Sequence, residues 1–179
     1  MKSIFKSSAS PHARITGFIY LFYFITAVLG ALLVKNKLVI FGYIVNGVSI
    51  ACYIIVTVLF YYLFKPVNKY LSLFAALLSL LGCALTAFSI FHLAIAPMIN
   101  PLLFFGPYCI LLGYLIFRSN FLPHFLGVLL IFAGIGWLII LTPLANYLSL
   151  YIKLLGILAE ASLMLWLIIK GVDNKRWNA

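Results

Sequence analysis

The chain has 179 residues, of which 66% are hydrophobic and only 8% are charged, and its mean hydropathy is +1.24. Soluble domains carry roughly 25% charged residues, so this composition excludes a water-soluble globular protein. The formal net charge is +10. Because the basic residues stand at the ends of apolar runs, we interpret them as signals of membrane orientation and expect no nucleic-acid partner.

Six apolar segments follow one another along the chain, with Lys, Pro and Asn marking their ends. A helix of about 20 apolar residues crosses a bilayer core, so the segments predict an all-α, six-helix transmembrane bundle whose partner is the lipid bilayer. They leave no room for a soluble domain, and residues 1–179 are expected to form one domain. The predicted spans are about 15–34, 38–64, 68–96, 101–117, 123–143 and 148–170.

The distribution of basic residues predicts the orientation of these helices. Most of the 12 Lys and Arg residues fall at the two termini and in the even-numbered loops, and the others are Lys35, Lys37 and Lys153 on the opposite side. Cytoplasmic loops carry an excess of Lys and Arg, so both termini are expected in the cytoplasm. The prediction is a multi-pass protein of the cytoplasmic (inner) membrane.

The third segment carries small side chains at steps of three and four residues: Ser72, Ala75, Ser79, Gly82 and Thr86. This spacing places them on one helix face, which favours close packing against neighbouring helices. A polar pathway along the stripe is the alternative.

The joint between the fourth and fifth segments predicts a tight helical hairpin. Arg118 suits a helix C-terminus, Asn120 tolerates the left-handed conformation that ends many helices, and Pro123 suits the first turn of the next helix.

Glu160 lies in the middle of the sixth segment, and the other acidic residue, Asp173, lies beyond its end. Inserting a carboxyl at the centre of a spanning helix costs about 2.5 to 3.5 kcal/mol, so Glu160 requires a partner, water or a neutral state. Lys153, Gly156 and Glu160 share one helix face, which we expect to point into the bundle. Glu160 should therefore lie within hydrogen-bond reach of a polar group on another helix or of ordered water.

Candidate neighbours of Glu160 are chosen by their depth in the membrane, and a binding site built from them is a hypothesis. His92 lies near the outer end of the third predicted span, where it serves either as a hydrogen-bonded interfacial side chain or as a proton relay to Glu160. Tyr43 and Ser89 are further neighbours by depth. The candidate ligand-binding residues are Glu160, His92, Asn46, Tyr108 and Lys153.

The sequence gives little support for an enzymatic function. It has no His pair at helical metal spacing, no second intramembrane acid, no nucleophile elbow and no glycine-rich phosphate loop. Cys52, Cys83 and Cys109 all lie within apolar segments without metal-ligand spacing, so we interpret them as small apolar side chains. We expect no catalytic residues, no metal and no cofactor.

Several stretches resemble a bacterial integral membrane family, the one catalogued as domain of unknown function 4386. They are PLLFFGPYCILLGYLIFRSNFLPHFLGVLLIFAGIGWL, ARITGFIYLFYF, FKPVNKYLSLFAALLSLLG and AEASLMLWLIIKGV. The chain departs from the family pattern at Asn120, where Gly is expected, at His124, where a basic residue is expected, and at Pro107. The resemblance implies a bacterial membrane protein with an acid shortly before the Leu-Trp-Leu run, at Glu160, and it transfers no activity.

Two hypotheses about function follow. In the first, the protein binds or carries a small apolar or cationic molecule, or a lipid, in a pocket around Glu160. In the second, it is a structural or accessory membrane protein whose polar groups only fix the packing of the helices. Replacing Glu160 with Gln distinguishes them, because a pocket acid is needed for ligand binding and a structural acid for stability.

Overall fold

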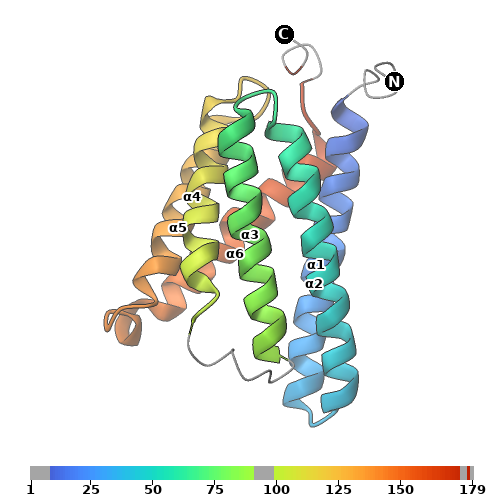
Figure 1. Ribbon diagram of the computed structural model, residues 1–179, viewed down its shortest axis with the longest axis vertical. Helices are drawn as coiled ribbons and strands as arrows, with labels where there is room; N and C mark the ends of the chain where they lie inside the picture. Colours follow the sequence, from blue (N-terminus) through green and yellow to red (C-terminus); the bar gives the residue numbers. More distant parts are fainter. Residues whose placement is uncertain (1–8, 91–98, 174–176, 178–179) are drawn as a thin grey trace.

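The computed structural model describes residues 9–90, 99–173 and 177, and over these residues the regular secondary structure is entirely helical. The predicted all-α fold with six helices is confirmed (Figure 1). The helices are α1 (Ala9–Lys35), α2 (Val39–Phe64), α3 (Lys69–Ile90), α4 (Leu102–Arg118), α5 (His124–Ile139) and α6 (Ala145–Ile169).

Most helix ends lie close to the predicted ends, with two differences. α1 begins at Ala9 rather than near residue 15, and α5 ends at Ile139 rather than near residue 143. The Thr142 hydroxyl donates a hydrogen bond to the Ile139 carbonyl at 2.7 Å, and this local bond turns the chain before α6. Residues 91–96, predicted to complete the third span, lie outside the described residues.

Four of the helices, α1, α2, α3 and α6, are long and apolar enough to cross a membrane. α4 and α5 are apolar but shorter, with 17 and 16 residues. Large apolar side chains are exposed on the outer surface, such as Ile40 at 73% and Phe41 at 63%. Such an apolar exterior is the surface expected of a protein in contact with lipid.

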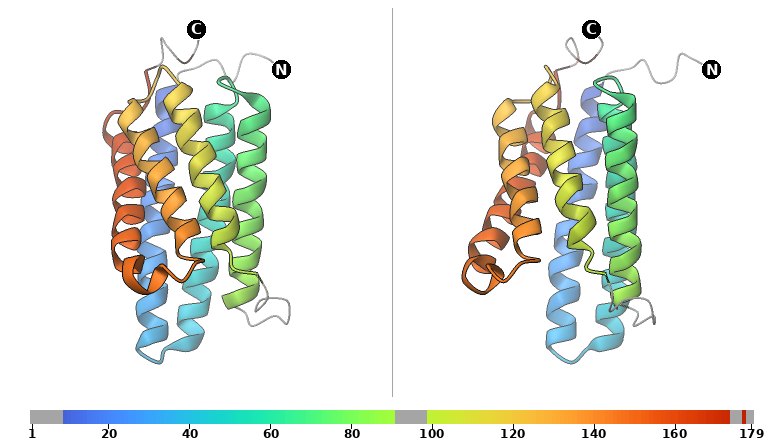
Figure 2. Two further views of the ribbon diagram at one scale, coloured as in Figure 1. Left: turned by 90° about the vertical axis from the view of Figure 1, so that its left-hand side faces the viewer. Right: turned by 60° about the vertical axis from the view of Figure 1, so that its left-hand side comes forward.

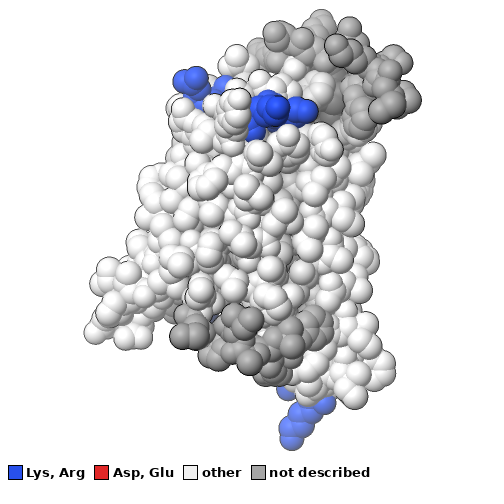
Figure 3. Space-filling view, in the orientation of Figure 1, with Lys and Arg blue, Asp and Glu red and all other residues white. Residues whose placement is uncertain are grey.

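Each helix packs mainly against its neighbours in the sequence, and α6 returns to contact α1, which closes the bundle (Figures 1 and 2). The start of α1 and the end of α6 lie at the same end of the molecule. We call the half of the bundle at this end the terminal half, and the half that contains the α1–α2 turn the far half. Basic side chains gather at both ends of the visible face, and more of them lie at the terminal end (Figure 3).

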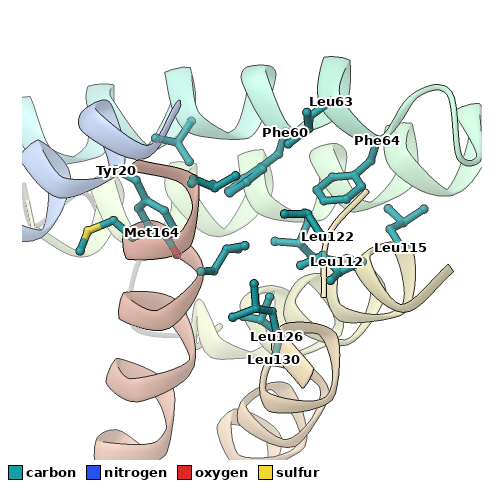
Figure 4. Close-up of a cluster of buried hydrophobic side chains, with 14 of the residues drawn as sticks. Tyr20, Phe60, Leu63, Phe64, Leu112, Leu115, Leu122, Leu126, Leu130 and Met164 are labelled. Atoms are coloured by element: carbon teal, nitrogen blue, oxygen red, sulfur yellow. The ribbon is translucent and has the colours of Figure 1, made fainter. Parts of the chain in front are cut away.

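Much of the buried apolar core lies in the terminal half, where the ends of α2, α4 and α6 meet the start of α5 (Figure 4). The core residues named in the next sentence are exposed by 5% or less, so their side chains pack against one another and hold the helices together by van der Waals contacts. They are Phe60, Leu63, Phe64, Leu112, Leu115, Ile116, Leu122, Leu126, Leu130, Leu163 and Leu167.

Glycines bring the backbones of α4 and α5 into contact. A Cβ atom added to Gly113 would lie 2.5 Å from the Gly127 carbonyl oxygen, and one added to Gly134 would lie 2.6 Å from that of Gly106. The predicted tight hairpin is confirmed, but Asn120 does not end α4 in a left-handed conformation, because Lys37 is the only described non-glycine residue with a positive φ. The Ser119 hydroxyl instead donates to the Ile116 carbonyl at 2.7 Å.

Four of the five small residues of the stripe on α3 are buried against its neighbours, as predicted for close packing, and Thr86 is half-buried. The Ser79 and Thr57 hydroxyls form a buried hydrogen bond at 2.7 Å between α3 and α2. The Ser72 hydroxyl donates to the Tyr61 carbonyl at 3.0 Å, and the Phe105 ring of α4 covers Gly82. These contacts hold α3 between α2 and α4.

Candidate binding site around Glu160

Glu160 is joined to α1 by a hydrogen bond from Tyr20. The Tyr20 hydroxyl donates to the Glu160 Oε2 atom at 2.7 Å, and Tyr20 itself is 2% exposed. This distance is typical of a good O–H···O bond. The prediction that Glu160 has a polar partner on another helix is confirmed, although the partner is none of the neighbours chosen by depth.

Close packing of the terminal parts of α1 and α6 brings this pair together. A Cβ atom on Gly17 would lie 2.8 Å from the Ile168 Cγ1 atom and 2.9 Å from its backbone nitrogen, so the two helices touch along their backbones. Tyr20 lies about one turn beyond Gly17 and reaches Glu160. Toward its start, α6 runs away from α1 (Figure 1), and Gly156, one turn before Glu160, packs under the Trp137 ring of α5. Glu160 therefore lies at the point along α6 where this helix begins to diverge from α1.

A cavity of about 230 Å³ lies beside Glu160, and we call it the Glu160 cavity. Side chains from α1, α2, α4, α5 and α6 surround it, so it occupies a position where five helices meet. Most of its lining is aromatic, and the Glu160 carboxyl is its acidic group. Its lining residues are Tyr23, Tyr53, Leu102, Phe105, Cys109, Trp137 and Glu160.

The aromatic wall of this cavity is held by contacts between rings. The Tyr53 ring lies 4.7 Å from Tyr23 and 5.6 Å from Phe105, measured between centroids, and it meets Phe105 edge to face. Tyr53 also meets Tyr20 edge to face at 6.1 Å. Such pairs add about 0.5 to 1.5 kcal/mol each beyond the burial of their area. The wall is therefore a packed cluster that spans α1, α2 and α4.

A second cavity, of about 170 Å³, lies on the other side of the same wall. It shares Tyr23, Tyr53 and Phe105 with the Glu160 cavity, and its other lining residues come from α1, α2 and α3. Asn46 lines it, so we call it the Asn46 cavity. Its lining residues are Tyr23, Ala27, Asn46, Ser49, Ile50, Tyr53, Cys83, Thr86, Ile90 and Phe105.

The structure brings only some of the candidate residues to these cavities. Glu160 and Asn46 line neighbouring cavities. Tyr108 is 2% exposed and lines neither of the two, but it meets the Tyr53 ring edge to face at 6.4 Å. His92 lies outside the described residues.

Lys153 is exposed and lines neither cavity, so our expectation that it would point into the bundle together with Glu160 is wrong. It lies about two helical turns from Glu160, where α6 has already left α1. Its long side chain can also place the ammonium group at the membrane surface.

Sequence reasoning missed the aromatic part of the site. Tyr20, Tyr23, Tyr53, Phe105 and Trp137 carry no distinctive motif in a chain of which 17% is aromatic. The available signal was the position of tyrosines deep inside apolar segments, because a buried tyrosine hydroxyl usually needs a hydrogen-bond partner.

Electrostatically, the Glu160 carboxyl has a neutral partner. Within the described part of the chain, no Lys, Arg or His forms a salt bridge with it, and its hydrogen bond comes from Tyr20. Among the same residues there is also no group of three or more His, Cys, Asp or Glu side chains placed to hold a metal ion. The site thus combines one carboxyl with a surface of aromatic rings.

Fold and surface together define an α-helical protein of membrane type. Residues 98–171 match the family model described as Domain of unknown function (DUF4386), which confirms the family resemblance over this part of the chain. An uncharacterized protein of the archaeon Archaeoglobus fulgidus is 28% identical over 123 residues, which cover 65% of this chain and 75% of that protein. No solved structure matches the chain.

Proposed function

We propose that this chain is a multi-pass protein of the cytoplasmic membrane, with both termini in the cytoplasm, that binds a small organic cation in the Glu160 cavity. The observation that carries the proposal is a carboxyl that faces an aromatic-lined cavity and has no basic partner among the described residues. Polar and ionisable groups inside membrane segments are costly, and they commonly mark ligand or ion pathways.

The lining of the cavity favours a cation over a neutral apolar molecule. Aromatic faces attract ammonium groups by cation–π interactions worth about 2 kcal/mol or more when desolvated, and a carboxylate adds direct charge pairing. A volume of about 230 Å³ is below the roughly 300 to 1,000 Å³ of cavities that hold drug-sized ligands. The expected ligand is therefore a small primary to quaternary ammonium compound.

The second candidate function is a structural one, and the bond between Tyr20 and Glu160 favours it. This bond joins residues 140 positions apart in the sequence and ties the first helix to the last. In that case the carboxyl only fixes helix packing, and the protein serves as a structural or accessory component of the membrane.

Two matched substitutions separate these functions. Glu160→Gln removes the negative charge but keeps an oxygen that can accept the Tyr20 hydrogen bond, whereas Tyr20→Phe keeps the charge and removes the bond. We expect Glu160→Gln to weaken tetramethylammonium binding by about 2 kcal/mol, roughly 30-fold, with little loss of stability. Tyr20→Phe should retain most of the binding and lose stability.

Calorimetric titration of the purified protein in lipid nanodiscs measures the affinity, and thermal unfolding of the same samples measures the stability. Equal affinity of the wild type and Glu160→Gln for tetramethylammonium, or no binding by the wild type, would reject the cation site. A loss of stability in Glu160→Gln as large as that in Tyr20→Phe would favour the structural function.

The proposed orientation has a separate test. A reporter that is active only in the cytoplasm, fused to the C-terminus, should be active, because most basic residues lie on the side of the termini. An inactive reporter on a well-expressed protein would reverse the orientation.

A further inference from the structure

We infer that the Asn46 cavity is a second subsite of the same binding site, and that the ligand is an organic cation with a neutral hydrogen-bonding group, such as a hydroxyl, at the end remote from its charge. This inference rests on the proposed function, because it takes the cation in the Glu160 cavity as its starting point. It adds the chemical class of the ligand and the residue that selects it.

Asn46 provides the first piece of evidence. Its side chain packs against Gly30 of α1 and borders the Asn46 cavity, and none of its amide atoms is hydrogen-bonded to any residue that the structure describes. An amide has two N–H donors and one carbonyl acceptor, and leaving them unpaired in apolar surroundings is costly. Because a helix surrounded by lipid offers no alternative partner, the amide is available to a molecule in the cavity.

Among the hydroxyl groups that line this cavity, that of Thr86 already has a hydrogen-bond partner. The Thr86 hydroxyl donates to the Gly82 carbonyl of its own helix at 2.8 Å, so its proton is used within α3. Ser49 also lines the cavity with a hydroxyl, but Asn46 offers a ligand more hydrogen-bonding groups, with two N–H donors and one carbonyl acceptor. A neutral polar group suits this cavity better than a second charge, because none of its lining residues is charged.

The wall between the two cavities consists of side chains that both cavities share: Tyr23, Tyr53 and Phe105. Tyr53 is 6% exposed and fixed among other rings, whereas Tyr23 and Phe105 are only half-buried. Rotation of these two side chains would open a passage for a methylene chain along the Tyr53 ring. A ligand that crosses this wall would place its ammonium group beside Glu160 and its polar end beside Asn46.

Two series of probes of increasing chain length test the inference. One series consists of alkyltrimethylammonium ions, and the other carries a hydroxyl at the far end of the same alkyl chain. In the wild type we expect the hydroxyl to improve affinity about five- to tenfold at one chain length, the length that spans the wall. Shorter hydroxylated probes should show no such gain, because their hydroxyl does not reach Asn46.

Asn46→Leu is the decisive variant, because leucine is similar in size to asparagine and makes no hydrogen bond. This substitution should abolish the improvement in affinity that the hydroxyl provides, which we call the hydroxyl gain. It should change the affinity for the plain alkyl series by less than about twofold. Thr86→Val is the matched control within the same cavity, and it should keep the gain because the Thr86 hydroxyl is bonded within its own helix. Affinities come from calorimetric titration in lipid nanodiscs.

Thermal unfolding without ligand provides a second readout. Asn46→Leu should unfold at the same temperature as the wild type or higher, because it removes an unpaired amide from an apolar environment. A lower unfolding temperature combined with an unchanged hydroxyl gain would identify Asn46 as a structural residue and overturn the inference. A wild type that shows no hydroxyl gain at any chain length would overturn it as well.

The proposed function and this inference fail in different ways. If Glu160→Gln binds the plain alkyltrimethylammonium ions as well as the wild type does, the cation site itself is rejected. If that binding depends on Glu160 but the hydroxyl gain does not depend on Asn46, only the second subsite is rejected.

Discussion

The two halves of the bundle are packed differently, although they are built from the same six helices. In the terminal half, leucine and phenylalanine side chains fill the space between α2, α4, α5 and α6, and Gly17 and Gly113 allow backbones to touch (Figure 4). In the far half, α6 diverges from α1 beyond Glu160, and both large cavities are found there. α4 and α5 keep their backbone contact in the far half as well, at Gly106 and Gly134, so the halves differ mainly in the packing of α6 on α1 and in the room for a ligand.

A glycine-to-alanine substitution in each half provides the strongest test of this difference, because the two losses in the free energy of unfolding should differ most. At Gly113 a new methyl group would meet the Gly127 carbonyl oxygen at 2.5 Å, and backbone atoms can yield only if α4 and α5 separate. We expect Gly113→Ala to lower the free energy of unfolding by about 3 kcal/mol.

Gly30→Ala is its counterpart in the far half. The new methyl group would meet the end of the Asn46 side chain, which can move toward the adjacent cavity. We expect a loss below about 1 kcal/mol, measured by the same denaturant-dependent unfolding assay. Equal losses in the two variants would contradict the difference between the halves.

The hydrogen bond between Tyr20 and Glu160 lies at the boundary between the halves. Tyr20→Phe should lower the free energy of unfolding by about 1 kcal/mol, because the ring stays packed and only the bond is lost. Combining Tyr20→Phe with Glu160→Met, which leaves no acceptor for the Tyr20 hydroxyl, gives a double-mutant cycle, and its coupling energy isolates this bond. A coupling energy of zero would mean that packing at Gly17 alone holds α1 on α6.

A buried pair away from the cavities provides the comparison for that bond. Thr57 and Ser79 join α2 to α3, and Thr57→Val should lower the free energy of unfolding by roughly 0.6 kcal/mol, the average for such bonds in membrane proteins. Cation affinity should not change, because neither residue lines the Glu160 or the Asn46 cavity. A changed affinity would show that α2 and α3 influence the far half through their packing.

The smallest expected effect concerns cysteine reactivity. Cys109 lines the Glu160 cavity and Cys83 lines the Asn46 cavity, whereas Cys52 lines neither. A saturating alkyltrimethylammonium ion should slow the reaction of Cys109 with a small membrane-permeant thiol reagent about two- to threefold, and leave Cys52 unchanged. Mass spectrometry of single-cysteine variants measures both rates, and equal slowing at Cys52 would indicate a general effect on the protein.

The sequence by itself determined the class of protein, the helices and the special position of Glu160. Apolar segments of about 20 residues between Lys, Pro and Asn predict helices because hydrophobicity and backbone hydrogen bonding are local properties. The small stripe on α3 and the hairpin between α4 and α5 were also predictable, because the residues that cause them are close in the sequence. Even the need of Glu160 for a polar partner followed from its chemistry alone.

Only the tertiary structure decided which residue became that partner. The choice of Tyr20 depends on the contact between Gly17 and Ile168, which are far apart in the sequence, and on the tilt that takes α6 from α1 to Trp137. The aromatic wall and the exposure of Lys153 depend on the same tilt. The rotation and tilt of a helix follow from the packing of distant side chains, and no local pattern of residues encodes them.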